Sequence, residues 1–332
     1  MRAAFFEGPR TFTVRPAPVP EPGPGEVRLR VRYCGVCGSD VSLFKTGALA
    51  GPGVVLGHEV SAAVDLDPAG AWGPGTRVVL FPGRGCGRCV WCREGKFRYC
   101  LDPPDGGTYG GGFAEFCTAP AGQLVPVPEG VDDRAAALAE PLAVALRAVG
   151  LAEAGPGDLA YVSGLGSLGL LSVAALREAG CRVVGADPRE ERRALGEELG
   201  CERVMDPTEE DPGAVTTSLD PHGPRVALEC AGAPDSLQQV VDACGPGGVV
   251  GILGVPMGPV SLLRMTLREL RSFSIQGPSF EALRAALELL GRRPELLRVV
   301  TDVVGLEDLP RAMARLADGQ GPSVKVLVSP SG

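Results

Sequence analysis

The sequence contains no long apolar run, no long run of basic residues and only two histidines. Acidic residues outnumber basic ones by 40 to 32, which gives a net charge of −8 and a pI near 5.0. This balance disfavours nucleic-acid and anionic-membrane partners, because both require neutralisation of phosphate charge. No apolar stretch approaches the ~20 residues that cross a bilayer, and the opening residues MRAAFFEGPR carry no apolar signal segment. We therefore expect a cytoplasmic protein with no nucleic-acid and no membrane partner.

Cysteine, in contrast to histidine, is abundant, with eleven residues. Four of them, Cys86, Cys89, Cys92 and Cys100, are separated by two, two and seven residues. Such CxxC steps place the sulfurs within reach of one ion, and four thiolates complete a tetrahedral shell that admits no substrate. The spacing therefore predicts a structural zinc site. The alternative is a loop of disulfide-paired or redox-active thiols, which the missing signal segment disfavours because disulfide frameworks are typical of small secreted domains.

A second group of candidate metal ligands comes from three separated segments. Cys37 lies in GVCGSD (35–40), His58 lies in GHE (57–59), and Glu140 precedes Pro141 in a helix-forming stretch. A thiolate, an imidazole and a carboxylate together suit a borderline-soft cation such as zinc. Three protein ligands leave a fourth position for water or substrate, which is the pattern of catalytic zinc. For Glu140, an exposed position on a helix face is the alternative, since glutamate is almost never fully buried unless it is paired.

The first part of the chain is expected to be mainly β. Residues 27–33 alternate apolar and charged side chains, as a half-buried strand does, and residues 54–66 and 77–81 are further strand candidates. A helix-forming run follows over residues 133–151, and we expect Pro141 to break or kink it.

From residue 158 onward, strands alternate with helices, which predicts a parallel, doubly wound sheet of the α/β class. The total of 332 residues exceeds the ~250–300 at which single cores stop growing, so two domains are expected. The predicted helices and strand after residue 277 are assigned to the first domain, because the parallel sheet of the second domain is already complete before them.

A glycine-rich turn lies between a predicted strand and a predicted helix, which is the position of the phosphate-binding turn in dinucleotide-binding proteins. The apolar run 158–162 leads into Gly164, Gly166 and Gly169 of a GxGxxG pattern, which opens a helix. The glycines let the backbone of the turn, including Ser167 and Leu168, approach a pyrophosphate at the helix N-terminus.

The next strand, residues 181–186, ends at Asp187. That carboxylate is placed to accept hydrogen bonds from the adenosine ribose and would repel a 2′-phosphate, which favours NAD over NADP. Arg189 and Arg192 lie nearby in the sequence and leave NADP open as an alternative.

The combination GVCGSD, GHE, CGRCVWCREGKFRYC, AEPLAVAL and GLGSLG, in this order across almost the whole chain, resembles the zinc-containing medium-chain alcohol dehydrogenase family, especially its polyol and threonine dehydrogenase branches. The resemblance implies a GroES-like, mostly β catalytic domain over residues 1–141 and 278–332, and a Rossmann NAD-binding domain over residues 142–277. It also implies one catalytic and one structural zinc per chain, and a homodimer or homotetramer.

The resemblance assigns roles to individual residues. Cys37, His58 and Glu140 match the catalytic zinc ligands, and Glu59 matches an acidic neighbour that can transiently ligate the metal. Asp40 matches the partner that orients His58, and Ser39 matches the hydroxyl that hands on the substrate proton. The cofactor-binding residues are Gly164, Gly166, Ser167, Leu168, Gly169, Asp187 and Arg192.

The expected reaction is hydride transfer between a secondary alcohol and NAD. The alcohol could be a polyol, a sugar, a cyclitol or an amino alcohol such as L-threonine. Two alternatives stay open from the residues alone: a zinc-independent reductase of the quinone or enoyl type on the same scaffold, and a non-catalytic protein that senses NAD or zinc.

Overall fold

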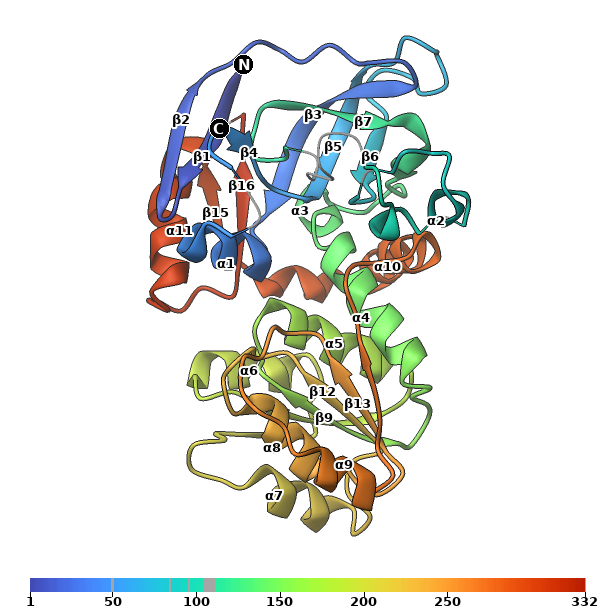
Figure 1. Ribbon diagram of the computed structural model, residues 1–332, viewed down its shortest axis with the longest axis vertical. Coiled ribbons are helices and arrows are strands. Elements are labelled where there is room, and N and C mark those ends of the chain that lie inside the picture. The colour runs from blue at the N-terminus through green and yellow to red at the C-terminus, as the bar shows by residue number, and fades with distance from the viewer. Residues whose placement is uncertain (49–50, 84, 95, 104–110, 332) are drawn as a thin grey trace. The chain divides into compact units, whose positions relative to one another are not determined.

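The computed structural model describes residues 1–48, 51–83, 85–94, 96–103 and 111–331. Contacts divide the chain into two compact units, Met1–Glu140 with Leu287–Gly332, and Pro141–Ala286 (Figure 1). The domain boundaries after residues 141 and 277 stay a prediction from the sequence. Among the described residues, no helix is long and apolar enough to cross a membrane.

The first unit is built on two sheets. The smaller has the order β2-β1-β4, and the larger has the order β15-β16-β3-β5-β6-β8, with β7 also paired to β3. The strands are β1 (Arg2–Gly8), β2 (Thr11–Pro16), β3 (Glu26–Gly35), β4 (Val54–Val55), β5 (Glu59–Leu66), β6 (Arg77–Leu80), β7 (Phe116–Pro120), β8 (Leu124–Pro126), β15 (Val300–Gly305) and β16 (Lys325–Ser329). The helices are α1 (Gly38–Thr46), α2 (Val90–Arg93), α3 (Asp133–Ala136) and α11 (Leu309–Ala317), with short 3₁₀ turns η1 (Phe97–Tyr99), η3 (Ala121–Gln123), η4 (Pro294–Val299) and η5 (Leu306–Asp308).

Strand β3 shows why this unit folds as it does. Val27, Leu29 and Val31 are fully buried, and they alternate with the more exposed arginines between them. The period-2 pattern therefore sets one face of the strand toward the core, as the sequence predicts. The strand then delivers the chain to Cys37.

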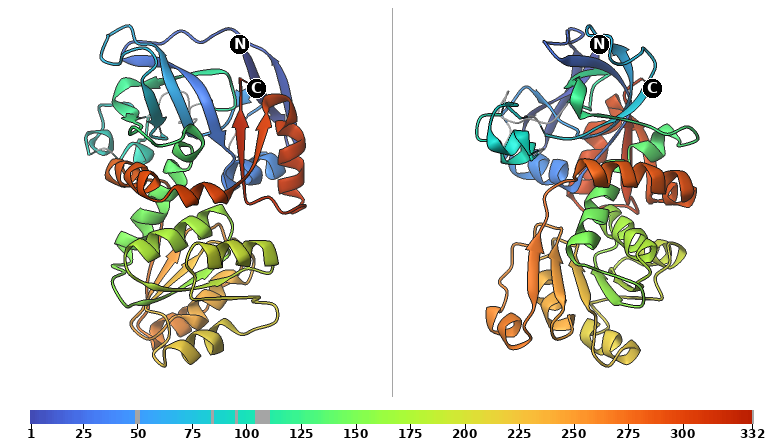
Figure 2. Two further views of the ribbon diagram at one scale, coloured as in Figure 1. Left: turned by 180° about the vertical axis from the view of Figure 1, so that it is seen from behind. Right: turned by 90° about the vertical axis from the view of Figure 1, so that its right-hand side faces the viewer.

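The second unit holds a six-stranded parallel sheet with the order β11-β10-β9-β12-β13-β14. Its strands are β9 (Leu159–Ser163), β10 (Arg182–Ala186), β11 (Arg203–Met205), β12 (Val226–Glu229), β13 (Val249–Ile252) and β14 (Arg271–Ser274). Its helices are α5 (Ser167–Glu178), α6 (Glu190–Glu198), α7 (Pro212–Leu219), α8 (Ser236–Ala243) and α9 (Leu262–Leu267), and they lie on both faces of the sheet (Figure 2). Numbered from β9, the order is 3-2-1-4-5-6, the Rossmann arrangement, so the predicted doubly wound sheet is confirmed.

Helices α4 (Ala139–Leu151) and α10 (Phe280–Arg292) carry the chain across the unit boundaries. The helical run predicted over 133–151 is interrupted, but not at Pro141. The break falls between α3 and α4, and Pro141 is the third residue of α4. Proline fits there because the first turn of a helix has N–H groups with no intrahelical acceptor, so its missing donor breaks no bond.

The strand predicted over 54–66 is also interrupted. Strands β4 and β5 are separate, and Gly57, with a φ of 96°, lies between them next to His58. A backbone in this region favours glycine because a side chain would be strained. The interruption places His58 outside regular structure, at the entrance to β5.

Candidate active site

Cys37 and Asp40 are fixed by the start of helix α1. Cys37 is the residue that precedes the helix, with extended backbone angles, and its N–H donates to Asp40 Oδ2 at 2.9 Å. Asp40 is buried, and its other oxygen lies 3.7 Å from His58 Nδ1. Burial raises the pKa of Asp40, while His58 and the Cys37 N–H oppose that rise. The helix start thus orients the thiol and supplies the carboxylate that faces the imidazole.

His58 and Glu59 complete a group of three possible ligands. The ligand atoms of Cys37, His58 and Glu59 all lie within 4.8 Å of one another. Ligand atoms about 2.0–2.3 Å from a tetrahedral zinc lie about 3.3–3.8 Å apart, so a group within this limit can close around one ion with small side-chain movements. Burial lowers the pKa of His58, but the charges of Asp40 and Cys37 outweigh burial and raise it. The donor set and its spacing fit zinc.

A lysine that sequence reasoning missed lies against this group. Lys325, at the start of β16, is 1% exposed, and its Nζ forms an ion pair with Glu59 Oε2 and donates to Val36 O at 3.0 Å. Burial lowers the pKa of Lys325, but the Glu59 carboxylate and Cys37 raise it above its ordinary value. The signal in the sequence is a single charge in the apolar strand VKVLV (324–328).

The other predicted residues of this centre occupy different places. Glu140 is buried in the first turn of α4, outside the group of three, but near enough for its charge to act on His58 and Lys325. Its burial shows that the alternative of an exposed helix-face acid is wrong. Ser39 is exposed in the first turn of α1.

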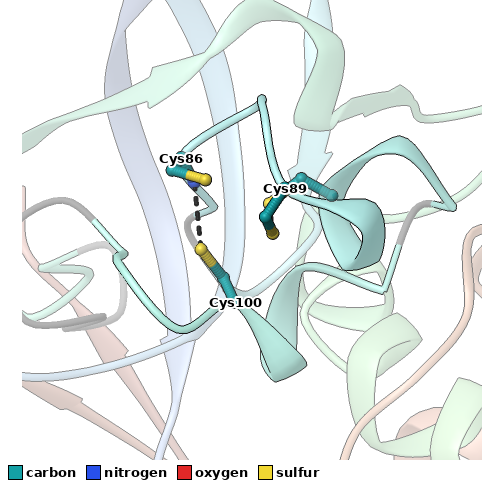
Figure 3. Close-up of side chains that lie close together, drawn as sticks. Cys86, Cys89 and Cys100 are labelled. Carbon is teal, nitrogen blue, oxygen red and sulfur yellow. Dashed lines mark hydrogen bonds between the residues drawn. The ribbon is translucent and has the colours of Figure 1, made fainter.

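The four clustered cysteines converge as their spacing predicts. Their sulfurs lie within 4.8 Å of one another, with Cys89 and Cys92 Sγ atoms 3.4 Å apart. Figure 3 shows Cys86, Cys89 and Cys100 facing one another, with the Cys86 N–H donating to Cys100 Sγ at 3.2 Å. Backbone N–H groups of Arg88 and Cys89 lower the pKa of Cys86 to about 6, whereas burial raises that of Cys92 to about 12. Four sulfurs at this spacing fit a tetrahedral zinc.

The glycine turn of the second unit has close-packed backbone. Gly164 has a φ of 90°, and a Cβ there would press on the backbone of Ala231, while a Cβ on Gly169 would overlap Gly164 O. Gly166 precedes α5, whose first residues are Ser167 and Leu168. The turn therefore presents a helix N-terminus at the carboxyl end of β9, the usual position for a dinucleotide phosphate.

Asp187 lies beside this turn. It is buried, and its Oδ2 accepts the Leu165 N–H at 2.9 Å and lies 3.4 Å from Arg192 Nη1. Its Oδ1 accepts the Arg189 N–H at 3.0 Å. Arg192 Nε is buried without a hydrogen-bond partner. The structure thus brings the predicted acid and the predicted arginine together at the glycine turn.

Residues 23–129 match the family described as "Alcohol dehydrogenase GroES-like domain", and residues 167–292 match the one described as "Zinc-binding dehydrogenase". The protein named "Probable D-xylulose reductase A" of Arthroderma otae is 32% identical over 326 residues, which cover 91% of this chain and 89% of that one. The chain belongs to the zinc-type medium-chain alcohol dehydrogenases.

Other similar proteins support the assignment of this chain to the alcohol dehydrogenases. The sorbitol dehydrogenase of Halalkalibacterium halodurans is 29% identical over 97% of each chain. A zinc-binding dehydrogenase of Sinorhizobium meliloti solved with NADP bound has a TM-score of 0.89 and 31% identity, over 99% of each chain. The chain is therefore a zinc-dependent alcohol oxidoreductase with a GroES-like and a Rossmann domain, and the two alternative functions are not supported.

Proposed function

We propose that Cys37, His58 and Glu140 hold the catalytic zinc of this dehydrogenase, with Glu59 as an acidic neighbour, and that Cys86, Cys89, Cys92 and Cys100 hold the structural zinc. The observation that carries the proposal is the convergence of the Cys37 thiol, the His58 imidazole and the Glu59 carboxylate, with the buried Glu140 near enough for its charge to act on His58. Of the two glutamates near the imidazole, Glu140 would ligate the zinc and Glu59 would lie beside it without being a permanent ligand.

The chain's own residues prepare this centre for acid–base chemistry. When bound, zinc acts as a Lewis acid that makes an alcohol hydroxyl more acidic and a carbonyl carbon more electrophilic. Asp40, held by the Cys37 N–H, lies 3.7 Å from His58 Nδ1 and would orient the imidazole, leaving the other ring nitrogen available to the metal. Ser39, exposed in the first turn of α1, hands the substrate proton on toward solvent.

The substrate proposed is a secondary alcohol: a polyol, a sugar, a cyclitol or an amino alcohol such as L-threonine. The names of relatives, a sorbitol dehydrogenase and a D-xylulose reductase, support this class. The proposed cofactor is NAD, because the buried carboxylate of Asp187 beside the glycine turn would repel a 2′-phosphate.

Initial rates with zinc-loaded protein test the substrate and the cofactor together. NAD and, separately, NADP are offered with a panel of polyols, sugars, cyclitols, L-threonine and simple secondary alcohols. We expect turnover with one class of secondary alcohol and higher kcat/KM with NAD than with NADP. Preference for NADP would contradict the role of Asp187.

The Cys37→Ser variant tests the metal assignment. Zinc content should fall from two ions per chain to one, and turnover should be lost while NAD still binds. Cys244→Ser is a matched control, because Cys244 is a buried thiol of the second unit. Full activity of Cys37→Ser would show that Cys37 is not a zinc ligand.

A homodimer or homotetramer in the cytoplasm is also proposed. Leu262, Leu263 and Leu267 of α9 are 66–73% exposed, and the adjoining β14 is an edge strand among the described residues. Exposed apolar side chains beside a strand edge are typical of a surface that another copy covers. The cytoplasm fits eleven free thiols. Light scattering after gel filtration should give a dimer or tetramer, and Leu263→Asp should lower the mass.

A further inference from the structure

Lys325 connects two of the three segments that carry candidate ligands of the catalytic zinc. Its Nζ is paired with Glu59, the residue after His58, and donates to the carbonyl oxygen of Val36, the residue before Cys37. The lysine and the glutamate are each 1% exposed. A buried ammonium group needs such partners, since an unpaired charge in the core is strongly unfavourable.

The sheet leaves space for this pair. Gly35 in β3 lies opposite Glu59 in β5 and opposite Leu327 in β16, two residues from Lys325. A Cβ on Gly35 would overlap Glu59 Oε2 and lie 2.9 Å from Lys325 Cε. The pair therefore occupies the place of the missing side chain, and its position is set by strand register.

Glu59 has two possible cationic partners. Its carboxylate is paired with Lys325, and the same carboxylate has an oxygen within 4.8 Å of the ligand atoms of Cys37 and His58. A zinc held by Cys37 and His58 would therefore compete with Lys325 for Glu59. The balance between the two cations decides whether Glu59 occupies a coordination position that substrate needs.

We propose that Lys325 is a positioning residue that holds the Glu59 carboxylate off the catalytic zinc and so keeps one coordination position open for substrate. This inference rests on the proposed catalytic zinc site. It assigns a function to a strand that lies 289 residues from Val36 along the chain.

The test replaces Lys325 by methionine, which keeps an unbranched side chain one atom shorter and removes its charge. With Co²⁺ in the catalytic position, the visible spectrum reports the number of ligands, because coordination geometry changes the absorption. In Lys325→Met we expect the spectrum to change toward a higher coordination number, affinity for the catalytic metal to rise about tenfold or more, and kcat to fall while the KM for NAD stays constant. Lys325→Arg, which restores the cation, should recover the wild-type spectrum.

Two further variants separate positioning from a general loss of structure. Lys325→Met with Glu59→Gln has no carboxylate to ligate the metal, so its spectrum should return to that of the wild type. Glu59→Gln alone should leave the wild-type spectrum unchanged, and this measurement does not require Lys325→Met to fold. A changed spectrum in Glu59→Gln, or an unchanged one in folded Lys325→Met, would overturn the inference alone. A wild-type protein that binds only one zinc would overturn the zinc site and this inference with it.

Discussion

A single methyl group added at Gly35 should strongly destabilise the first unit. In Gly35→Ala the new Cβ would overlap Glu59 Oε2 and lie 2.9 Å from Lys325 Cε. Both side chains are 1% exposed, so neither can turn toward solvent without opening the core. Separation of a buried ion pair costs about 3–5 kcal/mol. In a domain of this size each kcal/mol lowers the midpoint temperature by roughly 2–4 °C, so a decrease of about 6–20 °C is expected.

Thermal unfolding of zinc-loaded protein, followed by calorimetry, measures this effect. Gly305→Ala is the matched control, because it adds the same methyl group in the same unit, with nothing within 4 Å and a φ of −75°. The control should unfold within about 2 °C of the wild type. If Gly35→Ala unfolds at the same temperature as Gly305→Ala, the ion pair is not packed as tightly as described and the reasoning is refuted.

Three further changes probe the remaining sites. Asp187→Ala removes the charge that faces Arg192, so kcat/KM for NADP should rise about tenfold, equivalent to ~1.4 kcal/mol; unchanged NADP rates would mean that the carboxylate does not set cofactor choice. Cys92→Ser should weaken binding of the structural zinc more than about 100-fold, since loss of an outer-shell partner alone costs 10–100-fold, and metal analysis showing two tightly bound ions would contradict the four-cysteine site. Glu229→Ala removes an acceptor of three hydrogen bonds, including those from Ala231 and Gly232, and should lower the free energy of unfolding by about 2–4 kcal/mol; urea titration should show Glu229→Gln losing less, and equal losses would refute the role of its acceptor oxygen.

Features that depend on short spacing could be predicted from the sequence. The four cysteines lie within fifteen positions, and the glycine turn is flanked by its own strand and helix, so local chain geometry brings these residues together. These local motifs made it possible to predict the family, the Rossmann sheet and the zinc dependence, and all three predictions are confirmed. The roles of Ser39 and Glu140 stay predictions, because a proton relay and a bound metal are not visible in side-chain positions alone.

Features that depend on register or on exposed surface could not be predicted. Lys325 reaches Glu59 only because β16 pairs with β3 and β3 pairs with β5, and no local pattern encodes that alignment. Strand β14 has no signal in the sequence, because it is an edge strand whose residues are mostly exposed and it lacks the apolar run that marks the buried strands. Helix α9 has no buried residues, so its apolar side chains gave no one-sided pattern.

The place of β16 in the sheet has a consequence for the order in which the protein matures on the ribosome. The second unit, Pro141–Ala286, is continuous in the chain and can fold as soon as it is synthesised. The four-cysteine site is complete once residue 100 has emerged, so it can take up zinc early. Glu59, in contrast, waits for its counter-charge until residue 325 has been made. Until then nothing holds the Glu59 carboxylate away from Cys37 and His58, so the open coordination position for substrate is expected to form last, after the cofactor-binding unit is already folded.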